Sequence, residues 1–559
     1  MQKNGKKKET VSTGGHFPAV CASVVSGIIT IFVVLLVTVF PLIYRHAYFD
    51  ILETKYQCYY VCVIGMLVFS LMAALIMLAI DLARYGGKNA KALFARLHPH
   101  SWKQTFCAAD VAVLVFWLIA LISTFQSDYF YESFWGNEGR YTGLFLLTLY
   151  VAAYFVISRF WKMKGWVLEL FLISGMIVCA IGITDYFELD ILNFRGKIKP
   201  EQSTIFTSTM GNINTYTAYV GLLMGFSAGM FAAARSVGRQ IWYYLCLTVC
   251  FFAIIMGCSD NAYLALMAMF GLLPFVMFRT WKGTRRYLLM LAGFFTVVQC
   301  IDWINICYED MVIGLDSLFG VITGFGGLLY IVIALWLIVA ACYYTAWKTR
   351  ARGIAVPGSE EEKRAMLWGR RRILAWGIFA ALVIFAGIAA FYDVNVGGNA
   401  QRYGALGRYL LFDDSWGTNR GYIWKMSIAL YKEFPLRHKL FGYGPDTFGI
   451  LTTNKIFRGM IDVSGQIYDS AHNEYLQYFV TIGPFGLIAY LVFLGSSVLA
   501  MLKNYRSNIY LFGALSAVIC YAFQALVNIN LPIASPIMWL VFSIAAAACR
   551  EARKKQMAV

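Results

Sequence analysis

The chain has 559 residues, of which 60% are hydrophobic and only 14% charged, and its mean hydropathy is +0.64. This composition excludes an ordinary soluble domain and is typical of a protein that crosses a membrane many times. The net charge of +17 does not require a nucleic acid, because the basic residues lie mainly between apolar runs, where they reflect membrane topology and attraction to anionic lipid. We expect an all-α polytopic membrane protein that binds no nucleic acid.

Apolar runs long enough to cross ~30 Å of hydrocarbon recur along the whole sequence. We expect about fourteen spans, at 19–41, 58–80, 110–125, 141–157, 166–184, 213–234, 240–257, 261–278, 287–304, 320–345, 373–391, 474–500, 509–527 and 533–549. Only a short polar turn at 258–261 separates the seventh run from the eighth, which predicts a tight hairpin.

Charge placement predicts the side on which each loop lies. With both termini in the cytoplasm, inner segments carry a surplus of Lys and Arg and outer segments a surplus of Asp and Glu, which favours an even number of spans. A basic run at 3–8 precedes the first span and predicts a retained signal anchor. We divide the chain into a cytoplasmic N-terminus at 1–18, eleven spans at 19–391, an extracytoplasmic catalytic loop at 392–471, three spans at 472–549 and a cytoplasmic tail at 550–559.

The loop at 392–471 has the composition of a folded segment with short amphipathic helices. A helix is predicted at 420–434, with Thr418 or Asn419 as its N-cap and Pro435 as its stop. One stripe of this helix is apolar: Ile423, Met426, Leu430 and Phe434. The stripe would either pack against the loop itself or lie on the membrane surface or over a cavity, and both alternatives stay open.

A polar stretch, Ser-Ala-His-Asn-Glu-Tyr-Leu-Gln at 470–477, lies where this loop re-enters apolar sequence. Asp469 or Ser470 is a plausible N-cap, which would place His472 in the first helical turn, where the helix dipole lowers the pKa of the imidazole. A neutral imidazole can act as a general base, although it could also merely hydrogen-bond at a helix start. A Gly-Pro pair at 483–484 is predicted to kink the following span.

Charged residues and His are missing from the middle of every predicted span. Proton- and ion-coupled transporters usually need such groups, so the pattern favours an enzyme that acts at the outer surface on a membrane-anchored substrate. The sequence has no zinc-ligand spacing and no nucleotide-binding glycine loop in a credible context. We expect no metal and no cofactor.

Arginine can bind phosphate with its planar fork of donors. The predicted outer side carries few arginines, namely Arg45, Arg140, Arg195, Arg402, Arg408, Arg420, Arg437 and Arg458. Arg140 lies at the mouth of a span, and Arg420 begins the predicted loop helix, where the helix dipole would reinforce binding of an anion. For any single arginine, reaching along the membrane interface is the default explanation.

Two pairs of segments carry a family resemblance. The first is Thr-Asn-Arg-Gly-Tyr-Ile-Trp at 418–424 with Phe-Gly-Tyr-Gly-Pro-Asp-Thr-Phe at 441–448; the second is Ala-His-Asn-Glu-Tyr-Leu-Gln at 471–477 with Ile-Gly-Pro-Phe-Gly-Leu at 482–487. In order, spacing and position before a span they resemble the O-antigen ligase and O-antigen polymerase superfamily. Gly-Asn-Ile-Asn at 211–214 is a weaker similarity, since family members commonly have Gly-Asn-Pro-Asn there.

The resemblance implies a metal-independent glycosyltransferase of the bacterial cytoplasmic membrane. It would take a glycan from an undecaprenyl diphosphate carrier and pass it to a hydroxyl of a glycan, lipid or protein acceptor on the outer face. His472 would be the base or acceptor-positioning group, and Arg420 a diphosphate contact, which Arg140, Arg402 or Arg408 could supplement. Supporting residues would be Asn473, Glu474, Tyr443, Asn212 and Asn214.

Two departures limit the resemblance. Family members often have Ser-Arg in a hairpin such as 258–261, but this chain has Ser259 and Asp260 with no arginine there. The predicted spans also outnumber those of typical ligases. Ligase and polymerase remain alternatives, as do a flippase or exporter of lipid-linked glycans and a non-catalytic scaffold for envelope assembly.

Overall fold

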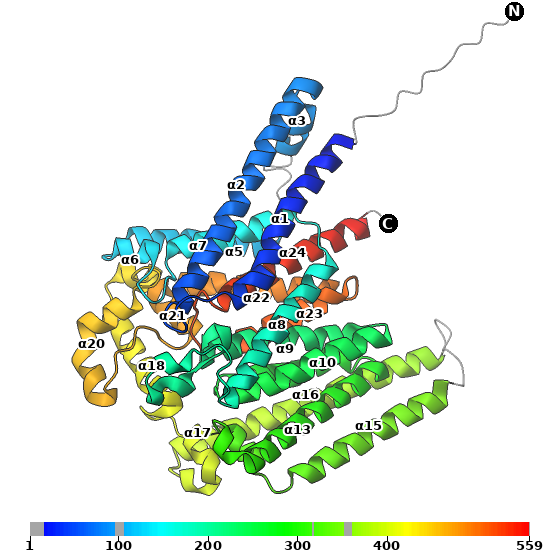
Figure 1. Ribbon diagram of the computed structural model, residues 1–559, viewed down its shortest axis with the longest axis vertical. Coiled ribbons are helices and arrows are strands. Elements are labelled where there is room, and N and C mark those ends of the chain that lie inside the picture. Colours follow the sequence, from blue (N-terminus) through cyan, green and yellow to red (C-terminus); the bar gives the residue numbers. More distant parts are fainter. Residues whose placement is uncertain (1–15, 96–105, 316–317, 351–359, 558–559) are drawn as a thin grey trace, which may run out of the picture.

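The computed structural model describes residues 16–95, 106–315, 318–350 and 360–557, and it is almost entirely helical (Figure 1). Ten of the described helices are long and apolar enough to cross a membrane: α1 (His16–Leu42), α2 (Ile51–Tyr85), α5 (Ala108–Phe125), α8 (Gly165–Tyr186), α9 (Ile213–Ala233), α10 (Val237–Met256), α13 (Trp281–Cys307), α15 (Leu328–Arg350), α16 (Glu360–Asn395) and α22 (Gly483–Asn504). The predicted all-α membrane class is confirmed, whereas the count of fourteen spans stays a prediction.

The remaining predicted spans also lie on helices. Shorter apolar helices are α7 (Leu144–Phe160), α11 (Ala262–Leu272) followed by α12 (Pro274–Met277), and α23 (Ile509–Gln524), and the last predicted span lies on α24 (Ser535–Met557). Two predicted spans are broken, the first into α14 (Leu318–Thr323) and α15, the second into α21 (Glu474–Thr481) and α22. The second break falls at Gly483, whose φ of +83° interrupts the helix where the Gly-Pro pair predicted a kink.

The elements between the spans are short. They are α3 (Lys88–Ala95), α6 (Phe130–Trp135), η2 (Arg195–Lys197), η3 (Pro200–Ile205), β1 (Phe206–Thr207), η4 (Ser208–Met210), β2 (Gly211–Asn212) and η5 (Glu309–Met311). Strands β1 and β2 pair antiparallel just before α9. The basic run at 3–8 lies outside the described residues.

Helix α9 lies in the middle of the bundle. Every residue from 215 to 231 is buried, and the helix packs most extensively against α23 and α10. Glycines permit the close approach to α23, because a Cβ at Gly225 would lie 2.6 Å from the Ser516 carbonyl oxygen and one at Gly229 2.3 Å from that of Phe512. Helix α16 has no buried residue in its most apolar stretch, so its surface is suited to face lipid.

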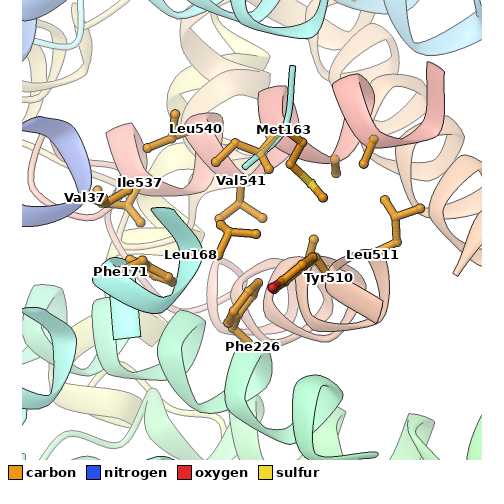
Figure 2. A pocket seen from close by; sticks show the side chains of 14 residues that line it. Val37, Met163, Leu168, Phe171, Phe226, Tyr510, Leu511, Ile537, Leu540 and Val541 are labelled. Atoms are coloured by element: carbon orange, nitrogen blue, oxygen red, sulfur yellow. The ribbon is translucent and has the colours of Figure 1, made fainter. Parts of the chain in front are cut away.

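An apolar pocket of about 400 Å³ lies between α1, α8, α9, α23 and α24 (Figure 2). Phe226 and Tyr510 point into it from one side, and Leu168 and Val541 from another (Figure 2). Its lining holds no charged residue, so it carries none of the chemistry predicted for the loop at 392–471.

Loops that charge placement assigned to one side contact each other. At one end of the bundle, Asp110 at the start of α5 accepts from Arg550 of α24 (2.6 Å) and lies 3.6 Å from Arg159 of α7. At the other end, the Thr209 hydroxyl donates to the Pro41 carbonyl at the end of α1 (2.8 Å). The end of the bundle with Thr209 and Pro41 also carries the loop at 392–471, and we call it the site end. The assignment of one end to the cytoplasm stays a prediction.

The loop at 392–471 folds into η6 (Ala400–Leu406), α17 (Gly407–Leu410), α18 (Trp416–Lys432), α19 (Leu436–Phe441) and α20 (Phe448–Ser464). Helices α18, α20 and α21 lie side by side at one edge of the molecule (Figure 1). They enclose a small apolar core formed by Ile423, Met426, Leu430, Phe434, Tyr443, Phe448, Leu451, Met460, Tyr468, Ala471 and Val480. The predicted apolar stripe therefore packs against its own loop.

The predicted start of the loop helix is correct, but its predicted cap is wrong. Gly417, Thr418 and Asn419 all have positive φ, so regular helical geometry begins at Arg420. Neither Thr418 nor Asn419 caps the helix with its side chain, because both adopt left-handed rather than extended backbone. The helix ends at Lys432, slightly before the predicted stop.

Candidate functional site

His472 lies in the connection between α20 and α21, with a left-handed φ of +47°. Its backbone N–H donates to the Ser470 hydroxyl oxygen at 3.3 Å. The neighbouring Ala471 is held from two sides: its carbonyl accepts from the Trp424 indole (3.1 Å), and its N–H donates to the Gln477 side chain (2.9 Å). Helices α18 and α21 together therefore fix the position of the histidine.

His472 precedes α21 rather than lying in its first turn, so this prediction is wrong. The N-cap is Asn473, whose side-chain oxygen accepts from the N–H groups of Tyr475 and Leu476, each at 3.0 Å. Asp469 pairs with an arginine, which leaves Asn473 as the residue positioned to cap the helix.

The structure lowers the pKa of His472 to about 3. Burial is the largest cause, followed by the positive charges of Arg420 and Arg140, while Asp469 opposes them. The imidazole is therefore neutral near pH 7, as predicted, but the causes are burial and the charges of two arginines rather than the helix dipole.

Arg420, the first residue of regular α18 geometry, is only 8% exposed. Its Nε donates to the Val527 carbonyl at 3.1 Å and its Nη1 to the Gly417 carbonyl. Within the described ranges no carboxylate lies within 4 Å of its guanidinium, and no hydrogen bond from Nη2 is found. Burial lowers its pKa, against the opposing charge of Asp260, but a guanidinium stays charged at neutral pH.

Asp260 occupies the α10–α11 hairpin, where the resemblance leads one to expect an arginine. Burial raises the pKa of its carboxyl group, and the charges of Arg420 and then Arg408 oppose the rise. Arg408, from α17, is exposed and donates to the Tyr409 hydroxyl at 3.0 Å. The hairpin therefore contributes a carboxylate whose ionisation is influenced by two guanidinium groups of the long loop, those of Arg420 and Arg408.

Arg140, the second arginine whose charge lowers the pKa of His472, lies in the turn between α6 and α7. Its Nε donates to Oδ2 of Asp469 at 2.8 Å, and its Nη2 pairs with Oδ1. Burial opposes ionisation of Asp469, but the hydrogen bond and charge of Arg140 outweigh it and hold the carboxyl pKa below its usual value. Arg140 and Asp469 thus form a two-point ion pair directly beside the His472 turn.

Asp446 anchors the turn that carries Arg140. One carboxylate oxygen accepts from the N–H groups of Asn137 (2.7 Å) and Thr142 (2.9 Å), which flank the arginine. Burial raises the pKa of Asp446 to about 6, although both hydrogen bonds oppose the shift. The aspartate of the Gly-Tyr-Gly-Pro-Asp segment therefore ties the α6–α7 turn to the long loop.

The same segment packs into the break between α21 and α22. The Gly444 N–H donates to the Thr481 carbonyl at 2.8 Å. A Cβ at Gly442 would lie 2.2 Å from that carbonyl oxygen, and one at Gly483 would lie 2.4 Å from the Leu440 carbonyl oxygen. Both glycines also have positive φ, so close approach and backbone geometry exclude a side chain at either position.

Asn212 and Asn214 join the site end to the α10–α11 hairpin. Asn212 caps α9 by accepting from the Asn214 N–H at 2.8 Å. The Asn214 side chain accepts from the Ser259 hydroxyl (2.7 Å), and its carbonyl accepts from Asn261 (3.1 Å) and Asn528 (3.0 Å). Asn528 directly follows Val527, whose carbonyl accepts a hydrogen bond from Arg420. The segment at 211–214 therefore supports the arginine indirectly.

The other predicted residues have structural contacts. The Arg402 side chain is 73% exposed and lies 3.3 Å from Asp393. The ring of Tyr443 stacks on His438 inside the loop core, with centroids 3.8 Å apart. Glu474 is buried and accepts from the hydroxyls of two tyrosines on α22 and α23. These contacts give Arg402, Tyr443 and Glu474 structural roles, and none of them indicates a direct role in a reaction.

Three acidic residues of this site were missed from the sequence: Asp260, Asp446 and Asp469. Each had a signal in the sequence. Asp446 lies within a segment that resembles the family, Asp260 occupies the hairpin where family members often have an arginine, and Asp469 directly precedes the polar stretch that contains His472. Among the described residues, no group of three or more His, Cys, Asp or Glu could hold a metal ion. The expectation of a metal-independent reaction stays a prediction.

A family model described as O-Antigen ligase matches residues 318–491. The matched region is less than half of the chain, but it contains Arg420, the segment at 442–446 and His472; Arg140 and the hairpin lie outside it. No curated protein matches the sequence significantly. Together with its many apolar helices, the match indicates a multi-pass membrane protein with an O-antigen ligase-like role in polysaccharide biosynthesis, and it supports assignment to the O-antigen ligase and polymerase family.

Proposed function

We propose that the protein transfers a glycan from an undecaprenyl diphosphate carrier to an acceptor hydroxyl at the outer face of the bacterial cytoplasmic membrane. One observation carries this proposal. A neutral His472 lies under the influence of two arginines, one of which, Arg420, is a buried cation without a carboxylate partner in the described chain. Such a cation is positioned to receive an anionic group from a ligand.

In the proposed reaction, the acceptor oxygen attacks the anomeric carbon and the bond between that carbon and the diphosphate oxygen breaks. The electron pair leaves with the diphosphate, and the acceptor proton passes to His472. The configuration at the anomeric carbon inverts. Arg420 stabilises the charge that develops on the leaving diphosphate, and preorganised groups of this kind are worth several kcal/mol.

The low pKa of His472 fits this reaction. In the protein without substrate, burial and the charges of Arg420 and Arg140 make the imidazole a weak base. A bound diphosphate would compensate the arginine charge and raise the pKa of the imidazole. The histidine would therefore gain basicity once the donor is in place.

The four candidate arginines differ in their availability for the diphosphate. Arg420 ranks first because it donates only to carbonyl oxygens. Arg408 ranks second, since its charge acts on the same Asp260 as that of Arg420. Arg140 would have to release Asp469 to bind phosphate directly, and Arg402 already has Asp393 as a neighbour.

Replacement of His472 by Ala tests the proposal. We expect the variant to reach normal levels in membranes and to lose transfer from a lipid-linked glycan donor, because the group that accepts the proton is gone. The control is His46→Ala, since the His46 side chain is 72% exposed in the α1–α2 connection and should be dispensable. Wild-type transfer by His472→Ala would refute the proposed role.

Product analysis separates the remaining alternatives. Purified enzyme with a defined lipid-linked donor should yield a new glycosidic bond, either to another repeat unit, as in a polymerase, or to a different acceptor, as in a ligase. Movement of the lipid-linked glycan across proteoliposomes without any new bond would identify a flippase instead.

A further inference from the structure

Four cations gather at the end of the bundle opposite to the site end. Arg235 lies in the turn between α9 and α10, and Lys282, Arg285 and Arg286 lie in the first two turns of α13. The charges of Arg286, Arg285 and Arg235 all act on Lys282. Arg286 also joins the two elements directly, because its guanidinium donates to two main-chain carbonyls at the end of α9, at 2.5 and 2.6 Å. We call these four residues the α13 basic group.

No acidic side chain balances this group at close range. In the described ranges, no carboxylate lies within 4 Å of any of its four members. Asp110, at the same end of the bundle, already pairs with Arg550 and lies 3.6 Å from Arg159. Like charges at close range repel each other, so a bound anion would relieve an unfavourable interaction within the group.

The place of the group in α13 adds to this imbalance. The amino-terminal end of a helix carries a partial positive charge, so cations are unfavourable there and anions are favourable. Helix α13 begins with Trp-Lys-Gly-Thr-Arg-Arg and has no acidic residue in its first turn. The helix dipole and the side chains of the group therefore attract the same kind of ligand, an anion.

Aromatic side chains mark the height of this group in the membrane. Trp281, the first residue of α13, is 45% exposed, and the Arg372 guanidinium of α16 lies over its ring at 5.4 Å. Arg285 lies over the ring of Tyr343 of α15 at 5.2 Å. Exposed tryptophan and tyrosine rings are typical of the level at which lipid headgroups lie. The cations are therefore positioned to meet membrane phosphates.

An apolar surface suited to acyl chains lies next to the group. Helix α15 packs against α13, and α16 contacts the start of α13 through Arg372, whose Nε donates to the Phe278 carbonyl at 3.2 Å. Only 17% of the most apolar stretch of α15 and none of that of α16 is buried. A soluble anion would use the cations alone, whereas a lipid uses both the cations and this surface.

We propose that the α13 basic group binds the phosphodiester of an anionic glycerophospholipid whose acyl chains lie along α15 and α16. Basic groups between membrane helices suit headgroups of this kind, and arginine donors match phosphate oxygens. The group lies at the end of the protein away from His472, and lipid binding there needs no glycan donor. The proposal therefore stands or falls independently of the proposed glycan transfer.

Thermal unfolding in nanodiscs of defined composition tests the proposal. The full-length protein is placed in phosphatidylcholine with an increasing fraction of phosphatidylglycerol, and its Tm should rise and then saturate, because a ligand of the folded state stabilises that state. Arg235→Gln combined with Lys282→Gln should lose most of this rise. In pure phosphatidylcholine the Tm of this double variant should equal or exceed that of the wild type, since two exposed charges that repel their neighbours are removed.

Lys503→Gln combined with Arg506→Gln is the matched control. Both residues are exposed and lie at the same end of the bundle, at the end of α22 and in the turn that follows it, but outside the α13 basic group. This double variant loses the same charge and should keep the rise in Tm. An equal loss in both double variants would reduce the effect to general surface charge and overturn the proposed site, as would a full rise in the variant of Arg235 and Lys282.

Inorganic phosphate separates the lipid from a free anion. Added to the wild type in phosphatidylcholine at constant ionic strength, it should leave the Tm nearly unchanged, because it cannot use the apolar surface of α15 and α16. A rise equal to that with phosphatidylglycerol would assign the group to a soluble anion and overturn the lipid proposal. No rise with phosphatidylglycerol would overturn it as well.

Discussion

Arg420 and Arg140 both lower the pKa of His472, but the protein holds them in different ways. Arg420 is 8% exposed and donates only to main-chain carbonyl oxygens, so its charge has no carboxylate partner within 4 Å in the described ranges. The side chain of Arg140 is 15% exposed and forms a two-point ion pair with Asp469. No carboxylate of the described ranges therefore balances the charge of Arg420 at close range, whereas Asp469 balances the charge of Arg140.

The backbone explains part of this difference. Three left-handed residues at 417–419 precede Arg420, and a Cβ at Gly421 would lie 1.8 Å from the Asp413 carbonyl oxygen. This tight turn brings the guanidinium against main-chain carbonyls. Arg140 lies in a turn that Asp446 ties to the long loop, within reach of Asp469. On the proposed function, Arg420 acts on the ligand and Arg140 positions the site.

The largest expected effect is on Arg420. Arg420→Lys should lower the kcat of transfer by about 100-fold, because a point charge does not reproduce the planar fork of donors at the leaving group. Arg140→Lys should cost less than tenfold, since its partner is a residue of the protein rather than the ligand. Steady-state kinetics with a lipid-linked donor measure both variants, and equal losses would remove the distinction between the two sides.

Asp446 tests the structural role of the Arg140 side. Asp446→Ala should lower the free energy of unfolding by about 2 kcal/mol or more, because two backbone N–H groups lose their buried acceptor. Asp446→Asn should cost less, since its side-chain oxygen can still accept. Thermal and denaturant unfolding in detergent measure these changes, and full stability of the Ala variant would contradict the anchoring role.

Asp446 also predicts a pH dependence of stability. Its pKa is about 6 in the folded protein against a reference value of 3.8, so the folded state holds the proton more tightly than the unfolded state. Its contribution to the free energy of unfolding should therefore fall as the pH rises from 3.8 to about 6. Comparison of the wild type with Asp446→Asn should isolate this slope, because the amide does not titrate.

The smallest effect is on the pH profile of transfer. With a His472 pKa of about 3, kcat/KM of the wild type should show no acid limb from this histidine between about pH 5 and 8. In Arg420→Gln the loss of a nearby positive charge should raise the pKa of His472, so the acid limb of the residual activity should move to higher pH. An unmoved profile would show that Arg420 does not act on His472.

Much of the local structure was predictable from the sequence. The apolar stripe follows from side-chain periodicity and the break at Gly483 from the Gly-Pro pair, and the structure confirms both. The start of regular helix at Arg420 is also confirmed, although the cap from which it was predicted does not form. The N-cap of α21 was not predictable, because Asp469 and Ser470 are plausible caps locally. Asp469 pairs instead with Arg140, a residue that the fold brings to it from far along the chain.

The sequence by itself determined the membrane class, the positions of the apolar helices and the candidates His472 and Arg420. These properties depend on composition, on runs of neighbouring residues and on short motifs. Only the tertiary structure decided that Arg140 is paired and that Arg420 lacks a carboxylate partner in the described chain. The reason is physical: burial, charge compensation and hydrogen bonding depend on which distant segments meet when the helices pack.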